Sequence, residues 1–272
     1  MKILFCGDIV GRSGRDVIID NLPHLRRSLD LDFVIVNCEN AAAGFGVTEK
    51  ICTDLFDAGV DVLTGGNHSW DNKDIISKID KHPRLLRPLN FPQGTPGRGY
   101  NTYTLPSGKK VTVVNVMCRL FMDPLDDPFA ALTQFFESHI LGHSTDAIII
   151  DTHGEASSEK MAMGHFADGR ASLVVGTHTH VPTADLQIFP KGTAYQTDAG
   201  MCGDYLSVIG MKPEEPILRF TRKMPTDRLT PAEGPATLCG VYIETDDKTG
   251  LTTYASPIRL GGRLSPLMPR SE

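Results

Sequence analysis

The chain has 272 residues, of which 40% are hydrophobic and 22% charged, a composition typical of a folded globular protein and not of a disordered one. The net charge is −6 and the cations are scattered without a basic stripe, which argues against duplex nucleic acid as a partner. No apolar run approaches the roughly 20 residues that cross a bilayer, and no leader pattern stands at the start, so we expect no membrane partner.

Short apolar runs rich in valine and isoleucine recur along the first two thirds of the chain, and each ends in polar residues or glycine. Runs of this length and content are typical of buried strands. The expected strands are Ile3–Cys6, Phe33–Val36, Val60–Leu63, Val111–Met117, Ala147–Ile150 and Leu173–Val175.

Helical periodicity fills the gaps between these strands. The predicted helices are Arg15–Ser28, Thr48–Ala58, Asn72–Ile79, Phe129–Leu141 and Ser157–Met163. Thr48 is a plausible N-cap for the second of them. Alternating strands and helices predict an α/β architecture.

The pattern changes after residue 181, where strand-like runs are separated by turn residues. These runs are Ala184–Phe189, Thr193–Thr197, Leu238–Thr245 and Leu251–Ile258, with a hairpin turn at Lys248-Thr249-Gly250. We expect a single domain over residues 1–272, in which residues 1–181 carry the functional half and 182–272 form a second, more antiparallel sheet. The proline- and charge-rich segment 212–235 is interpreted as a surface excursion.

Cysteine usage indicates the compartment. The six cysteines are widely spaced and form no Cys-x-x-Cys motif. We interpret them as free thiols in a reducing environment, which predicts a cytoplasmic protein.

Polar side chains follow five of the expected strands at the point where each strand ends. They are Asp8, Glu39, Asn40, Asn67, His68, His153, His178 and His180. In open α/β sheets ligands bind at the carboxyl ends of the strands, so these side chains are expected to converge. Taken singly, each could be a helix cap, a turn residue or a structural histidine. Their joint occurrence in chain order favours a common site.

The composition of this set indicates metal chemistry. Carboxylates, amide oxygens and imidazoles suit Fe, Mn, Zn or Co. Two such ions bridged by a carboxylate would activate a water and withdraw charge from a phosphoryl group. We place His178 and His180 on one strand, where alternate residues face the same side.

Three other residue groups have competing interpretations. Gly7, Gly11 and Gly14 resemble a dinucleotide-binding loop, but their spacing differs from that motif and Asp8 would face an anionic pyrophosphate. Trp70 could stack on a base, although packing is the simpler interpretation. Asp71 is interpreted as the cap of the helix expected at Asn72–Ile79.

At these residues the sequence resembles the calcineurin-like metallophosphoesterase superfamily. The matching stretches are Gly7-Asp8-Ile9-Val10, Asn37-Cys38-Glu39-Asn40, Gly66-Asn67-His68-Ser69, His153-Gly154-Glu155 and Gly176-Thr177-His178-Thr179-His180. The chain departs from the superfamily pattern at Val10, Glu39, Ser69 and Thr177. All four departures are similar to one subgroup, the YmdB-like phosphodiesterases, as is the string Ser158-Glu159-Lys160-Met161-Ala162-Met163-Gly164.

The resemblance implies a four-layer α/β/β/α sandwich and two metal ions, most simply iron, with manganese as the alternative. By the same resemblance Asp8, Asn40 and His180 would bind one ion. Asn67, His153 and His178 would bind the other, Glu39 would bridge them, and His68 would donate a proton to the leaving group.

The implied activity is hydrolysis of cyclic nucleotide monophosphates, 2′,3′-cyclic ones first and 3′,5′-cyclic ones as a further candidate, by a hydroxide that bridges the metals. Members tend to form homo-oligomers. Two alternatives stay open: a phosphomonoesterase acting on nucleotides or phosphoproteins, and a regulatory protein that binds a metal and a nucleotide without turning it over.

Overall fold

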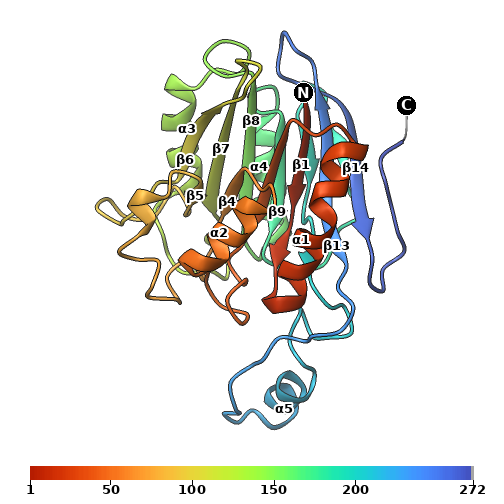
Figure 1. Cartoon of the computed structure of the whole chain (residues 1–272). Coiled ribbons are helices and arrows are strands. Elements are labelled where there is room, and N and C mark those ends of the chain that lie inside the picture. Colours follow the sequence, from red (N-terminus) through yellow and green to blue (C-terminus); the bar gives the residue numbers. More distant parts are fainter. Residues whose placement is uncertain (271–272) are drawn as a thin grey trace.

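The computed structural model describes residues 1–270, which form two mixed β-sheets flanked by helices (Figure 1). The first sheet contains β1 (Lys2–Cys6), β3 (Phe33–Asn37), β4 (Val62–Thr64), β5 (Leu85–Leu86), β13 (Leu238–Thr245) and β14 (Thr252–Leu260). Its spatial order is β14-β13-β1-β3-β4-β5, with β1, β3, β4 and β5 parallel to one another.

The second sheet contains β6 (Tyr100–Thr104), β7 (Lys110–Met117), β8 (Ala147–His153), β9 (Leu173–Thr177), β10 (Gln187–Ile188) and β11 (Ala194–Gln196). Its order is β10-β11-β9-β8-β7-β6, and β7, β8, β9 and β11 run parallel. A short parallel pair, β2 (Asp8–Ile9) and β12 (Met201–Cys202), continues from the end of β1.

Five α-helices and one 3₁₀ turn complete the described chain. They are α1 (Gly11–Ser28), α2 (Glu49–Asp57), η1 (Ile79–Lys81), α3 (Pro128–Ser138), α4 (Ser157–Ala167) and α5 (Glu214–Arg222). The predicted N-cap is confirmed, because the Thr48 side chain accepts a hydrogen bond from the Ile51 amide at the start of α2.

Side chains on opposite faces of the two sheets form three hydrophobic core clusters. One face of the first sheet, including Leu4 and Val34, packs on Leu22 of α1 and Leu55 of α2. Its other face packs on the second sheet, whose outer face is covered by α3 and α4. The predicted α/β/β/α sandwich is therefore confirmed as the architecture.

The expectation that residues 182–272 build their own sheet is wrong. Strands β10 and β11 extend the second sheet beside β9, whereas β13 and β14 extend the first sheet beside β1. Strand β13 pairs with the side of β1 that β3 leaves open. As a result β1 lies inside the sheet and is not an exposed edge strand.

The helix expected at Asn72–Ile79 is also absent, since this segment consists of turns that lead into η1. The Asn72 side chain accepts a hydrogen bond from the Asp74 amide, an alternative to helical bonding that asparagine offers readily. The expected surface excursion at 212–235 holds α5, which projects from the body on a long loop (Figure 1).

The six cysteines are free and buried, as predicted. Within residues 1–270 no helix combines the length and apolarity that would let it traverse a lipid bilayer.

Candidate metal centre

All eight side chains selected from the sequence lie where parallel strands of the two sheets end. Asp8 is in β2, directly after β1, while Glu39 and Asn40 follow β3. Asn67 and His68 follow β4, His153 is the last residue of β8, and His178 and His180 follow β9. The loops of the first sheet and the short strand β2 thus supply the carboxylates and amides, and the second sheet supplies three imidazoles.

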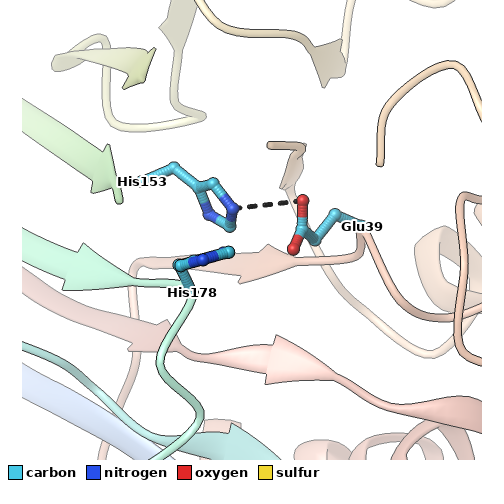
Figure 2. A group of neighbouring side chains, drawn as sticks. All are labelled: Glu39, His153 and His178. Carbon is cyan, nitrogen blue, oxygen red and sulfur yellow. Dashed lines mark ion pairs between the residues drawn. The ribbon is translucent and has the colours of Figure 1, made fainter. Parts of the chain in front are cut away.

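The ligand atoms gather into two groups that share one residue. Atoms of Glu39, His153 and His178 lie within 4.8 Å of one another, and so do atoms of Asp8, Glu39 and His180. Figure 2 shows the Glu39 carboxylate directed towards His153, whose Nε2 is 3.2 Å from Glu39 Oε2. A carboxylate common to two ligand groups is the arrangement that a bridged pair of metal ions requires.

The two amides lie beside these groups. Asn67 Oδ1 lies 2.9 Å from His153 Nε2. The Asn40 amide nitrogen donates to the Gly44 carbonyl, and this leaves Asn40 Oδ1 buried without a hydrogen-bond partner. Asp8 Oδ1 is likewise buried and accepts no hydrogen bond. Unpaired buried acceptors are costly, and a bound cation would satisfy both, so the residues fit a metal.

Neighbouring groups orient the imidazoles. His180 Nδ1 lies 2.7 Å from the Ile209 carbonyl, which can only accept, so Nδ1 donates and Nε2 is left for a metal. His153 Nδ1 lies 2.9 Å from Thr177 Oγ1, which itself donates to Asp151 Oδ1. Nδ1 of His153 therefore donates as well. Such outer partners commonly set the orientation of metal-binding histidines.

The electrostatics of the cluster indicate a missing positive charge. Burial lowers the pKa of His153, but the carboxylates of Glu39, Asp8 and Asp151 outweigh it and raise that pKa to about 9. Burial raises the pKa of Glu39, but His153 outweighs it and lowers that pKa to about 2. Burial raises the pKa of Asp8 well above its usual value. Without another cation, His153 thus holds a proton among the acids.

A glycine permits the close approach of these ligands. A Cβ atom on Gly66 would overlap Glu39 Oε2 and His153 Nε2. No side chain fits between the β4 loop and the cluster, which explains why glycine precedes Asn67.

The loop after β9 carries His178 and His180 in left-handed conformations, with φ of 97° and 66°. The prediction that both lie on one strand is therefore wrong, because β9 ends at Thr177. Burial and the neighbouring His153 lower the pKa of His178 to about 3. This imidazole is neutral at ordinary pH and can bind a metal without losing a proton.

A buried ion pair missed by sequence reasoning supports this loop. Lys160 Nζ donates to the Thr177 carbonyl and to Asp198 Oδ2, at 3.1 and 3.0 Å. The same carboxylate oxygen accepts from the Thr179 amide. The signal was available, since Lys160 lies inside one of the strings that carry the family resemblance.

His68 stands beside the ligand groups and belongs to neither of them. Its Nδ1 lies 2.7 Å from Asp71 Oδ2, and its ring meets Phe45 edge-on at 5.1 Å between centroids. Asp71 was expected to cap a helix; instead, it contacts His68, because no helix follows it. This pair was outside the sequence prediction.

A cavity of about 580 Å³ opens at the cluster. Glu39, Asn40, His68, His178 and His180 line one end of it. The remaining wall is mostly apolar, with two cations, and consists of Phe45, Val208, Ile209, Met211, Pro216, Arg219, Phe220, Lys223 and Leu229. Most of this wall comes from the segment around α5, which the sequence did not connect with the site.

The competing interpretations from the sequence find simple packing explanations. A Cβ on Gly7 would overlap the Gly200 carbonyl, and one on Gly14 would overlap that of Cys202. Both glycines therefore allow backbones to approach closely. Trp70 packs against the core and meets Phe91 edge-on, and it does not line the cavity described above.

Comparison with known proteins identifies a family and a similar protein of known name. The family model described as YmdB-like protein matches residues 4–258. The chain is 51% identical over 249 residues to a protein of Bacillus subtilis (strain 168) named 2′,3′-cyclic-nucleotide 2′-phosphodiesterase, covering 92% of this chain and 93% of that one.

Two solved structures are similar over nearly their whole length. A hypothetical protein from Thermus thermophilus superposes with a TM-score of 0.89 at 41% identity, covering 97% of this chain and 100% of that chain. A novel phosphatase of Mycoplasma pneumoniae gives a TM-score of 0.88 at 35% identity, covering 96% and 93%.

Proposed function

Because the chain belongs to the YmdB-like protein family, we propose that it is a metal-dependent phosphodiesterase that hydrolyses 2′,3′-cyclic nucleotides. One structural observation carries the proposal: Glu39 lies within 4.8 Å of two separate sets of candidate metal-ligand atoms. The relative named as a 2′,3′-cyclic-nucleotide 2′-phosphodiesterase gives the substrate class. We extend the same proposal to 3′,5′-cyclic nucleotides as a second class of substrate.

In this proposal Asp8, Asn40 and His180 hold one ion, Asn67, His153 and His178 hold the other, and Glu39 contacts both. The geometric groups are compatible with that division, since His178 falls in one and His180 in the other. Two bound ions would lower the pKa of a water molecule and withdraw charge from the phosphoryl oxygens. The mixed oxygen and nitrogen donors suit iron or manganese.

The reaction breaks the bond between phosphorus and O2′ of the ribose and joins a water oxygen to phosphorus. The leaving O2′ needs a proton, and a neighbouring imidazole can supply one. His68 is suited to this role because it lines the cavity and its Nδ1 is bonded to Asp71. Its Nε2 is the ring nitrogen left to donate to the leaving oxygen. The apolar wall near Phe45 would receive the base.

Location and assembly are further parts of the proposal. Six free, buried cysteines are consistent with a reducing compartment, and we propose the cytoplasm. Homo-oligomer formation is proposed from the family resemblance alone.

The test combines metal content with hydrolysis of 2′,3′-cyclic AMP, after loading with iron or manganese under reducing conditions. We expect about two ions in the wild type and a kcat that falls ~10²–10⁴-fold in His68→Asn with the metals retained. Glu39→Gln should lose both metal and activity. His24→Asn, an exposed histidine of α1, is the matched control and should behave as the wild type.

The outcomes separate the alternatives. A metal-loaded protein that cleaves phosphomonoesters but no diester would replace the proposal with a phosphomonoesterase. A variant that loses its metal but hydrolyses 2′,3′-cyclic AMP at the wild-type rate would contradict the metal-dependent mechanism. A protein that binds metal and nucleotide but turns over neither ester would be the regulatory alternative.

A further inference from the structure

The cavity beside the metal centre contains positive charge that a mononucleotide does not use. Arg219 of α5 and Lys223, which caps its end, line the same cavity as Glu39 and His68. A nucleoside 2′,3′-cyclic phosphate carries one anionic group, and the bound metal ions would take that group. The two cations therefore have no counterpart in such a substrate.

The charge is local to this segment and opposes that of the whole chain. Between residues 212 and 229 there are five cations (Lys212, Arg219, Arg222, Lys223 and Arg228) and three acids (Glu214, Glu215 and Asp227), a balance of +2 in a chain of net charge −6. Within this acidic chain, the positive wall is the place in the cavity that attracts an anion.

Arg219 is held in place by neutral partners. Its Nε donates to Thr226 Oγ1 at 2.7 Å and its NH2 group donates to the Asp227 carbonyl at 3.0 Å. Within residues 1–270 no carboxylate pairs with Arg219 or Lys223. A fixed guanidinium without a carboxylate partner is suited to a phosphate, because it is a planar multiple donor.

Aromatic rings line the same cavity as these cations and the metal ligands. Phe45 meets His68 edge-on, and the Arg228 guanidinium lies 5.7 Å from the Phe45 ring centroid. The Phe220 ring has Lys223 Nζ 5.9 Å from its centroid. Rings interleaved with cations are the surface on which single-stranded nucleic acids stack their bases and place their phosphates.

We propose that the substrate is the 3′ end of a single-stranded RNA that terminates in a 2′,3′-cyclic phosphate, and that Arg219 and Lys223 bind the next phosphate along the strand. The inference rests on the proposed function, which supplies the reaction at the terminal phosphate. It is compatible with the lack of a basic stripe for duplexes, because a single strand can enter the cavity by its end.

The test compares kcat/KM of the metal-loaded enzyme for 2′,3′-cyclic AMP with that for a diadenylate ending in a 2′,3′-cyclic phosphate. We expect the dinucleotide to be preferred by about 10-fold or more, as a charge-assisted phosphate contact would provide. The preference should shrink as salt is raised. In Arg219→Gln/Lys223→Gln the ratio of the two kcat/KM values should fall towards one.

The matched control is Lys212→Gln/Arg222→Gln. It removes the same charge from exposed residues of the same segment that do not line the cavity, and should keep the preference. Lys223→Gln alone leaves the Arg219 hydrogen bonds in place, and it should lower the ratio without disturbing the loop.

A wild-type ratio near one, or an equal loss in the control, would overturn this inference while hydrolysis of cyclic AMP upheld the proposed function. Equal preference for adenosine 5′-phosphate 2′,3′-cyclic phosphate would overturn the assignment to RNA in favour of a phosphorylated mononucleotide. If no ester reacts, the proposed function fails. Binding of diadenylate 3′-phosphate relative to adenosine 3′-phosphate, in the same variants, then decides the inference on its own.

Discussion

His68 contacts a carboxylate at one ring nitrogen and borders the cavity, so its orientation depends on a single short hydrogen bond. The partner, Asp71, lies three residues further along the same loop. A proton donor must point at the leaving oxygen, and a small misplacement costs much of its effect.

Asp71→Asn is therefore expected to lower kcat about 10- to 100-fold while metal content and thermal stability stay at wild-type values. An amide can no longer hold the imidazole as a charged acceptor does. The measurement is kcat on 2′,3′-cyclic AMP alongside metal analysis. Asp74→Asn, in the same loop but bonded to Lys78, is the control, and equal effects in both variants would contradict the prediction.

His153 links metal binding to pH. Its pKa of about 9 without metal means that it is protonated below that value, whereas a metal ligand must be neutral. Apparent metal affinity should thus rise about 10-fold per pH unit up to about 9 and then level off. Competition with a chelator between about pH 6.5 and 8.5 measures this, and an affinity independent of pH would refute it.

At the scale of elements, helix α4 contributes more to the site than its position behind the second sheet suggests. Lys160 and Asp198 are both fully buried, and together they hold the carbonyl and amide groups of the loop that follows β9. Loss of one partner leaves an uncompensated buried charge.

Lys160→Met is expected to reduce the free energy of unfolding by about 3–5 kcal/mol. Adding Asp198→Asn should restore part of the loss, because the unpaired carboxylate is then removed. Urea unfolding of metal-free protein measures both. Lys81→Met, on the exposed side of η1, should change stability by less than about 0.5 kcal/mol. A double variant less stable than the single one would contradict this explanation.

The sequence predicts well those helices and strands whose structure depends on their own residues and not on distant segments. Apolar runs such as Phe33–Val36 became strands of nearly the predicted length, and Thr48 capped α2. The helix at Asn72–Ile79 failed because side-chain hydrogen bonds within the loop replaced helical ones. The sheet assignment of β13 failed because it depends on pairing with β1, more than two hundred residues away.

The same distinction applies to the candidate site. Positions at strand ends could be read from the sequence, and all eight residues lie at such ends, with His68 beside the ligand groups. The left-handed loop of His178 and His180, the contact of Asp71 with His68 and the wall from α5 could not, because each depends on how separate segments approach one another. The metal identity and the role of each ligand stay proposals.

At the scale of the whole molecule, the candidate metal ligands come from both sheets. Glu39 follows β3 of the first sheet and Asp8 lies in β2, which continues from β1, whereas His153 ends β8 and His180 follows β9 of the second sheet. An ion bound by both would cross-link them and would be released on unfolding, so that metal stabilises the native state alone.

Chelation is accordingly expected to lower the free energy of unfolding, by about 4 kcal/mol relative to protein with free metal at 1,000 times its dissociation constant. Denaturant unfolding before and after chelation measures the effect, and adding manganese back should reverse it. Glu39→Gln should show little response to either treatment. A wild type as stable without metal as with it would refute the cross-link.

The position of β1 has a consequence for biosynthesis. Lys2 pairs with Glu244 and Cys6 with Gly240, so one side of β1 is completed only by a strand that is translated more than two hundred residues later. Until the ribosome has released residues 238–245, the nascent chain carries β1 with a row of unpaired amide and carbonyl groups, which is the feature that invites pairing with other chains. Asp8 lies in β2, which continues from this strand, and a settled metal cluster therefore requires residues 238–245 as well.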